Sequence, residues 1–90
     1  MGVVARSLES KLTAGLAPTD LQVVDDSARH AGHAGASAAG ESHFNVTVTS
    51  AAFAGLSRVQ RQRLVYGLLT EELAGPVHAL SLITRAPGEG

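Results

Sequence analysis

The stretch His43-Phe44-Asn45-Val46-Thr47-Val48-Thr49 decides the fold, because apolar and polar residues alternate along its whole length. Alternation with a period of two is typical of a β-strand that buries one face. Phe44, Val46 and Val48 are therefore expected to point into the core. A second strand is predicted over residues 21–24, and the two strands should pair antiparallel.

A short amphipathic helix is predicted upstream of these strands, over residues 4–16. Apolar side chains recur there at four-residue spacing, with charged residues between them. The apolar positions are Val4, Leu8, Leu12 and Leu16. The sequence Ala17-Pro18-Thr19-Asp20 then ends the helix.

A second helix and a last strand are predicted downstream. Ser57 is the expected N-cap of a helix that runs to Leu69, and residues 71–73 add a turn or a short further helix before Gly75-Pro76. Val77 to Thr84 reads as the last strand. A helical crossover favours a parallel, right-handed connection onto the strand at 43–49.

These elements predict an α+β domain with the order α-β-β-α-(α)-β, a three-stranded mixed sheet and helices packed on one face. We expect a single domain over residues 1–90, with an ordered core at about 4–86 and a frayed tail at 87–90. The segment 25–42 is expected to be a long loop between the first two strands. It far exceeds the usual hairpin connection of about two to five residues.

Composition excludes several classes of function. The net charge of −1 gives no overall field that would attract nucleic acid or anionic lipid. The chain has no cysteine, so any thiolate at a metal site must come from a partner. No apolar run reaches the roughly 20 residues needed to span a bilayer, and the N-terminus lacks the apolar core of a signal peptide. We therefore expect a cytoplasmic protein without membrane contact.

The histidines carry the most chemistry. His30 and His33 lie in the long loop, whereas His78 opens the last strand, so the two regions can meet only through the fold. Imidazole is a common ligand of transition metals. The pattern therefore indicates a shared metal site.

An enzymatic reading has little support. The acidic pairs Asp25-Asp26 and Glu71-Glu72 are adjacent in sequence, so their members point in different directions. Serine and histidine are present without a nucleophile elbow. We expect a non-enzymatic protein.

Several ordered motifs over residues 4 to 87 resemble the BolA family. They are Asp25-x-Ser27-x-x-His30, Ser42-His43-Phe44, Phe53-x-Gly55, Arg61-x-Arg63-x-Val65-Tyr66 and Val77-His78-Ala79-Leu80. The resemblance implies a fold similar to class II KH domains. It also implies an adaptor that shares a 2Fe-2S cluster with a monothiol glutaredoxin, for cluster assembly or transfer or for iron and redox regulation. The glutaredoxin cysteine and glutathione would supply the sulfur, and no cluster is expected on the isolated chain.

The resemblance assigns His78 as the C-terminal cluster ligand. His30 matches the loop ligand when counted from the start of its motif, and His33 is the alternate. Gln62 stands where many members carry histidine, on a helix face where no ligand is expected. Each histidine also has a purely structural interpretation. His78 can be part of an apolar strand, and the loop histidines can be solvated residues. His43 is interpreted as a packing or capping residue.

DNA binding is the alternative function. Some BolA-like proteins are described as transcriptional regulators of stress response and cell morphology, and KH-like folds include nucleic-acid binders; a shared fold is only an analogy. Arg58, Arg61 and Arg63 are the candidate contacts, although helical spacing turns Arg63 away from the other two. The same arginines are more typical of a solvated helix face. Weak DNA binding is the most that this face predicts.

Overall fold

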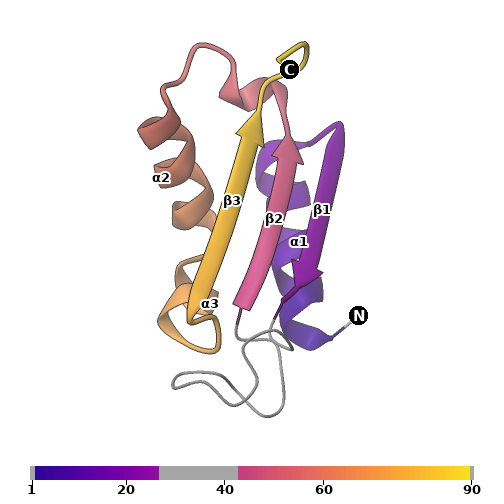
Figure 1. Ribbon diagram of the computed structural model, residues 1–90, viewed down its shortest axis with the longest axis vertical. Helices are drawn as coiled ribbons and strands as arrows, with labels where there is room; N and C mark the ends of the chain where they lie inside the picture. The colour runs from indigo at the N-terminus through magenta and orange to yellow at the C-terminus, as the bar shows by residue number, and fades with distance from the viewer. Residues whose placement is uncertain (1, 27–42, 90) are drawn as a thin grey trace.

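The computed structural model describes residues 2–26 and 43–89. Their elements, in chain order, are α1 (Val3–Leu16), β1 (Asp20–Asp25), β2 (His43–Thr49), the 3-10 turn η2 (Ala51–Phe53), α2 (Arg58–Leu68), α3 (Thr70–Ala74) and β3 (Ala79–Arg85) (Figure 1). Within these ranges, no helix is long and apolar enough to cross a bilayer. The predicted α+β architecture is confirmed.

The three strands form one mixed sheet in the order β1-β2-β3. β1 pairs antiparallel with β2, and β2 pairs parallel with β3. Both pairings agree with those expected from the sequence. Because β2 is central and its neighbours run in opposite directions, the end of β1 lies beside the starts of β2 and β3 (Figure 1).

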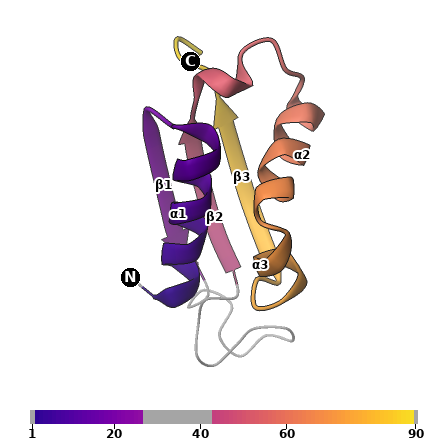
Figure 2. The ribbon, with the colours of Figure 1, turned by 180° about the vertical axis from the view of Figure 1, so that it is seen from behind.

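The helices cover one face of the sheet and leave the other face open (Figure 2). Phe44, Val46 and Val48 of β2 are at most 1% exposed, as their alternation predicts. They pack in one core cluster with the buried side of α1 and with the buried residues of η2 and α2. The intervening β2 residues lie on the open face and are only half-buried.

β3 begins two residues later than the sequence predicts, at Ala79 rather than Val77. Val77 is buried, and its N–H donates to the carbonyl of Glu72 at 2.9 Å. This bond closes the turn after α3, so Val77 does not join the sheet. His78 therefore lies just before β3, between the turn and the strand.

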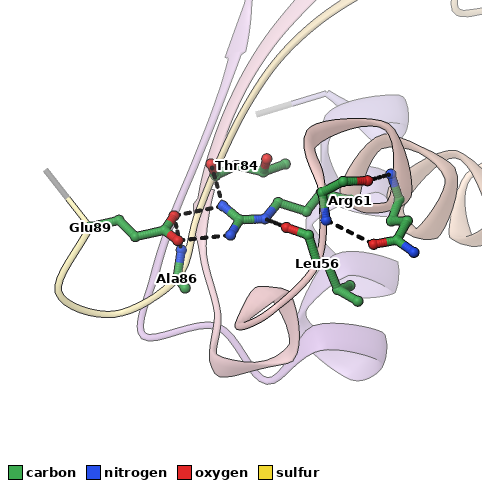
Figure 3. A network of polar contacts seen from close by, with 7 residues as sticks. Leu56, Arg61, Thr84, Ala86 and Glu89 are labelled. Atoms are coloured by element: carbon green, nitrogen blue, oxygen red, sulfur yellow. Dashed lines mark hydrogen bonds and ion pairs between the residues drawn. The ribbon is translucent and has the colours of Figure 1, made fainter.

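The residues after β3 are held against the body of the protein. Ala86 is buried, and its N–H donates to Glu89 Oε1 at 2.9 Å. Both terminal nitrogens of Arg61 donate to the Glu89 carboxylate, at 2.6 and 2.7 Å (Figure 3). Bidentate pairs of this kind are among the stronger hydrogen-bonded contacts. The frayed tail predicted at 87–90 is thus corrected as far as residue 89, because Arg61 supplies a partner that the sequence pattern did not reveal.

Replacement of Glu89 by glutamine is expected to loosen this tail and to speed hydrogen exchange at the Ala86 amide. The Arg61 guanidinium, followed by the Ala86 N–H, lowers the pKa of Glu89 from 4.5 to about 2. A carboxyl with a lowered pKa stabilises the fold fully above its ordinary pKa. The wild-type tail should therefore lose its protection as the pH falls from 4.5 towards 2.

Exchange can be followed by NMR, with Glu9→Gln as the control because Glu9 is exposed on α1. Equal protection of Ala86 in Glu89→Gln and in the wild-type chain would contradict the role of this ion pair.

Candidate metal site

His78 is exposed at the point where the chain enters β3. The residue before it is anchored, because Val77 is 3% exposed and bonds back to Glu72. The residue after it, Ala79, is paired with His43 in the parallel ladder. An exposed imidazole is therefore carried on backbone that is fixed on both sides.

His43 is the neighbour that sequence reasoning missed. The ring centroids of His43 and His78 are 6.4 Å apart, and the ring planes are tilted by 34°. The sequence predicts a packing or capping role for His43, because it opens an apolar strand. The signal that could have found it is the parallel pairing itself, since two parallel strands that both begin near a histidine bring the two rings to one edge.

A small hollow of about 130 Å³ opens beside His43 on the uncovered side of the sheet. Asp26, Asn45 and Ser81 line it together with His43, so its wall carries several oxygen atoms. The Asp26 N–H also donates to the His43 carbonyl at 2.7 Å. This bond joins the residues on either side of segment 27–42.

The predicted loop ligands His30 and His33 lie in that segment, outside the described residues. Their assignment therefore stays a prediction. The residues that flank the segment, Asp26 and His43, both lie at the edge of the sheet where His78 is found. In residues 2–26 and 43–89, no group of three or more histidine, aspartate or glutamate side chains could hold a metal ion.

A buried carboxylate supports the segment that carries His78. Glu72 of α3 is 7% exposed; it accepts from Ser7 Oγ at 2.6 Å and pairs with Lys11 Nζ at 2.8 Å. Burial would raise the pKa of Glu72, yet the hydrogen bonds from Lys11 and Ser7 outweigh it and the pKa lies below its ordinary value. Glu72 therefore ties α3, and with it the turn before His78, to α1.

The three arginines of α2 do not form one cationic face. Arg58 and Arg63 are exposed, whereas the side chain of Arg61 is 12% exposed. Arg61 donates to the Leu56 carbonyl at 3.0 Å and pairs with Glu89 (Figure 3). The prediction of Arg61 as a nucleic-acid contact stays a prediction, although its guanidinium already bonds within the protein.

The sequence and the fold both match known proteins. A family model described as BolA-like protein matches residues 12–89. The BolA domain of SufE1 from Arabidopsis thaliana superposes with a TM-score of 0.89 at 42% identity, over 100% of this chain and 99% of that domain.

Two curated relatives have names that bear on function. Protein BOLA1, chloroplastic, from Arabidopsis thaliana is 45% identical over 94% of this chain and 54% of its own length. The DNA-binding transcriptional regulator BolA of Escherichia coli is 43% identical over 91% of this chain and 74% of its own. The chain spans 25% to 62% of the length of several curated relatives that it matches.

Glu72→Ala is expected to lower the free energy of unfolding by about 2 kcal/mol, because a buried acceptor of two side-chain donors is lost. Glu71→Ala is the matched control, since the Glu71 side chain is 86% exposed and its contact with Lys11 should contribute little. Urea unfolding at neutral pH measures the free energy of unfolding of both variants.

The contribution of Glu72 also depends on pH. Because its pKa is lowered in the folded state, the stabilisation should be complete above the ordinary value of 4.5 and fade as the pH falls below it. The difference in the free energy of unfolding between wild type and Glu72→Gln should become smaller over the same pH range. An equal loss of unfolding free energy in Glu71→Ala and Glu72→Ala would show that the buried contacts of Glu72 do not stabilise the fold.

Proposed function

This chain belongs to the BolA-like protein family, and we propose that it is a non-enzymatic adaptor that shares a 2Fe-2S cluster with a monothiol glutaredoxin. The cluster is the cargo of this adaptor. His78 is the proposed principal ligand, with His30, or alternatively His33, as the second. The observation that carries the proposal is the exposed His78 imidazole, held on fixed backbone at the edge of the sheet where segment 27–42 leaves and returns.

The donor set of this chain fits half of such a site. Histidine can replace cysteine on one iron of a 2Fe-2S cluster, as it does in Rieske centres. The chain has no cysteine, so the cluster sulfur ligands would come from the glutaredoxin cysteine and glutathione. When bound, the cluster would supply electron transfer or would itself be passed on to an acceptor. The neutral, deprotonated imidazole of His78 would hold one of its irons.

Cellular location belongs to the same proposal. We keep the cytoplasmic location expected from the sequence as a prediction, while one of the relatives described above is named as chloroplastic.

The isolated chain should carry no cluster, whereas a mixture with glutathione-loaded monothiol glutaredoxin should form a coloured heterodimer. Visible circular dichroism and size exclusion measure this. His78→Ala should abolish the shared cluster or shorten its lifetime at least tenfold, because even the loss of outer contacts commonly costs about 10- to 100-fold in metal affinity. His30→Ala should weaken the cluster less, and His33→Ala least.

Ile83→Ala is the control for His78→Ala, since Ile83 is also exposed and lies on β3 but outside the hollow beside His43. An unchanged cluster spectrum and lifetime in His78→Ala would refute the assignment. An iron-sulfur chromophore on the isolated chain after anaerobic reconstitution would refute the sharing of ligands.

DNA binding is the second candidate, favoured by the name of the Escherichia coli relative. The structure leaves Arg58 and Arg63 exposed on α2, and Arg61 is held by Glu89. The described part of α2 thus offers two accessible guanidinium groups. They would add at most two phosphate contacts.

We expect weak, non-specific DNA binding that fades at physiological ionic strength. Two neutralised phosphates give a slope of about −1.8 for log K against log salt. Arg58→Ala/Arg63→Ala should remove most of this dependence, whereas Arg61→Ala should mainly loosen the tail. Fluorescence anisotropy over a salt series measures the DNA affinity. Nanomolar, sequence-specific affinity at physiological salt would favour the transcriptional regulator over the cluster adaptor.

A further inference from the structure

Two imidazoles from different strands meet at one edge of the sheet. His43 opens β2, and His78 directly precedes β3, yet their ring centroids are 6.4 Å apart. The parallel register fixes this neighbourhood, because His43 is paired with Ala79. His78 is exposed and His43 is partly buried, so both are within reach of solvent.

We propose that His43 and His78 together bind a single divalent transition-metal ion, with Zn²⁺ as the probe, on this chain without a partner. Imidazole suits zinc, copper and nickel, and it does not require sulfur beside it. The inference rests on residues other than the predicted loop ligands. It goes beyond the proposed function, from which it takes only the metal-binding role of His78.

The spacing of the rings fits one shared ion. Zinc–nitrogen bonds are about 2.0–2.1 Å, which places the ring centres of two ligands to one tetrahedral zinc about 5 Å apart. The observed 6.4 Å is roughly 1 Å wider. Rotation of the exposed His78 side chain closes this difference, since exposed side chains change rotamer within nanoseconds.

The surroundings favour a cation. The hollow beside His43 is lined by Asp26, Asn45 and Ser81, all of which are acidic or polar residues. These groups can bond to the waters that complete the coordination of the ion. With two protein ligands rather than the three or four of structural and catalytic zinc sites, the ion should bind reversibly.

Occupancy of this site has a consequence for His78. One imidazole nitrogen cannot bind zinc and a cluster iron at the same time. Zn²⁺ should therefore compete with the shared cluster for His78, which would make cluster handling sensitive to free zinc.

Calorimetric titration of Zn²⁺ into the full chain tests the site, together with NMR spectra of the histidine rings. The expected result is one ion per chain and movement of the His43 and His78 ring signals together. His43→Ala and His78→Ala should each weaken binding at least tenfold. The His30→Ala/His33→Ala double variant should retain the site.

Zinc affinity that is unchanged in His43→Ala, or lost in His30→Ala/His33→Ala, would overturn the proposal. Far-UV circular dichroism verifies that each variant is folded. If a variant fails to fold, the ring signals of the wild-type chain decide, because zinc must move both rings and unmoved His43 signals would refute the site.

The glutaredoxin assay separates this proposal from the proposed function. Zinc binding that depends on both histidines, in a chain that shares no cluster, would refute the adaptor role alone. If the chain shares a cluster but its zinc affinity is unchanged in His43→Ala, only the two-histidine site would be refuted.

Discussion

The central position of β2 is the constraint on which the rest of the structure depends. Its alternating residues bury Phe44, Val46 and Val48 under the helices, and both of its edges are paired. A slip of one residue would turn this apolar set to the open face, so the register is strongly fixed. Because β1 runs antiparallel and β3 parallel to β2, the end of β1 and the starts of β2 and β3 meet at one edge. The topology thereby gathers Asp26, His43 and His78 from distant parts of the chain.

Much of the fold follows from local sequence pattern. The alternation over 43–49, the four-residue spacing in α1 and the capping residue Ser57 each specify their element, and the capping box formed by Ser57 and Gln60 is present. Helix and strand boundaries agree within one or two residues. Such features are predictable because they depend on residues close together in the chain.

Contacts between distant residues were not predictable in the same way. The Arg61–Glu89 pair joins residues 28 positions apart, and the Ser7–Glu72 hydrogen bond joins residues 65 apart. No local pattern indicates either one, so the tail was expected to fray. The proximity of His43 to His78 was not predictable for the same reason. It depends on the register between β2 and β3, which only the assembled sheet defines.

The candidate site combines fixed backbone with an accessible side chain. Val77 and Ala79 hold the chain on both sides of His78, and the buried Glu72 fixes α3 before it, while the imidazole itself reaches solvent. Such an arrangement suits a ligand presented to a partner. The central claim can be tested by pulsed electron paramagnetic resonance of the reduced cluster, formed between ¹⁵N-histidine-labelled chain and unlabelled glutaredoxin. The account predicts ¹⁵N hyperfine coupling from histidine nitrogen bound to iron, reduced in any cluster that His78→Ala still forms, and a spectrum without ¹⁵N coupling in the wild-type complex would contradict it.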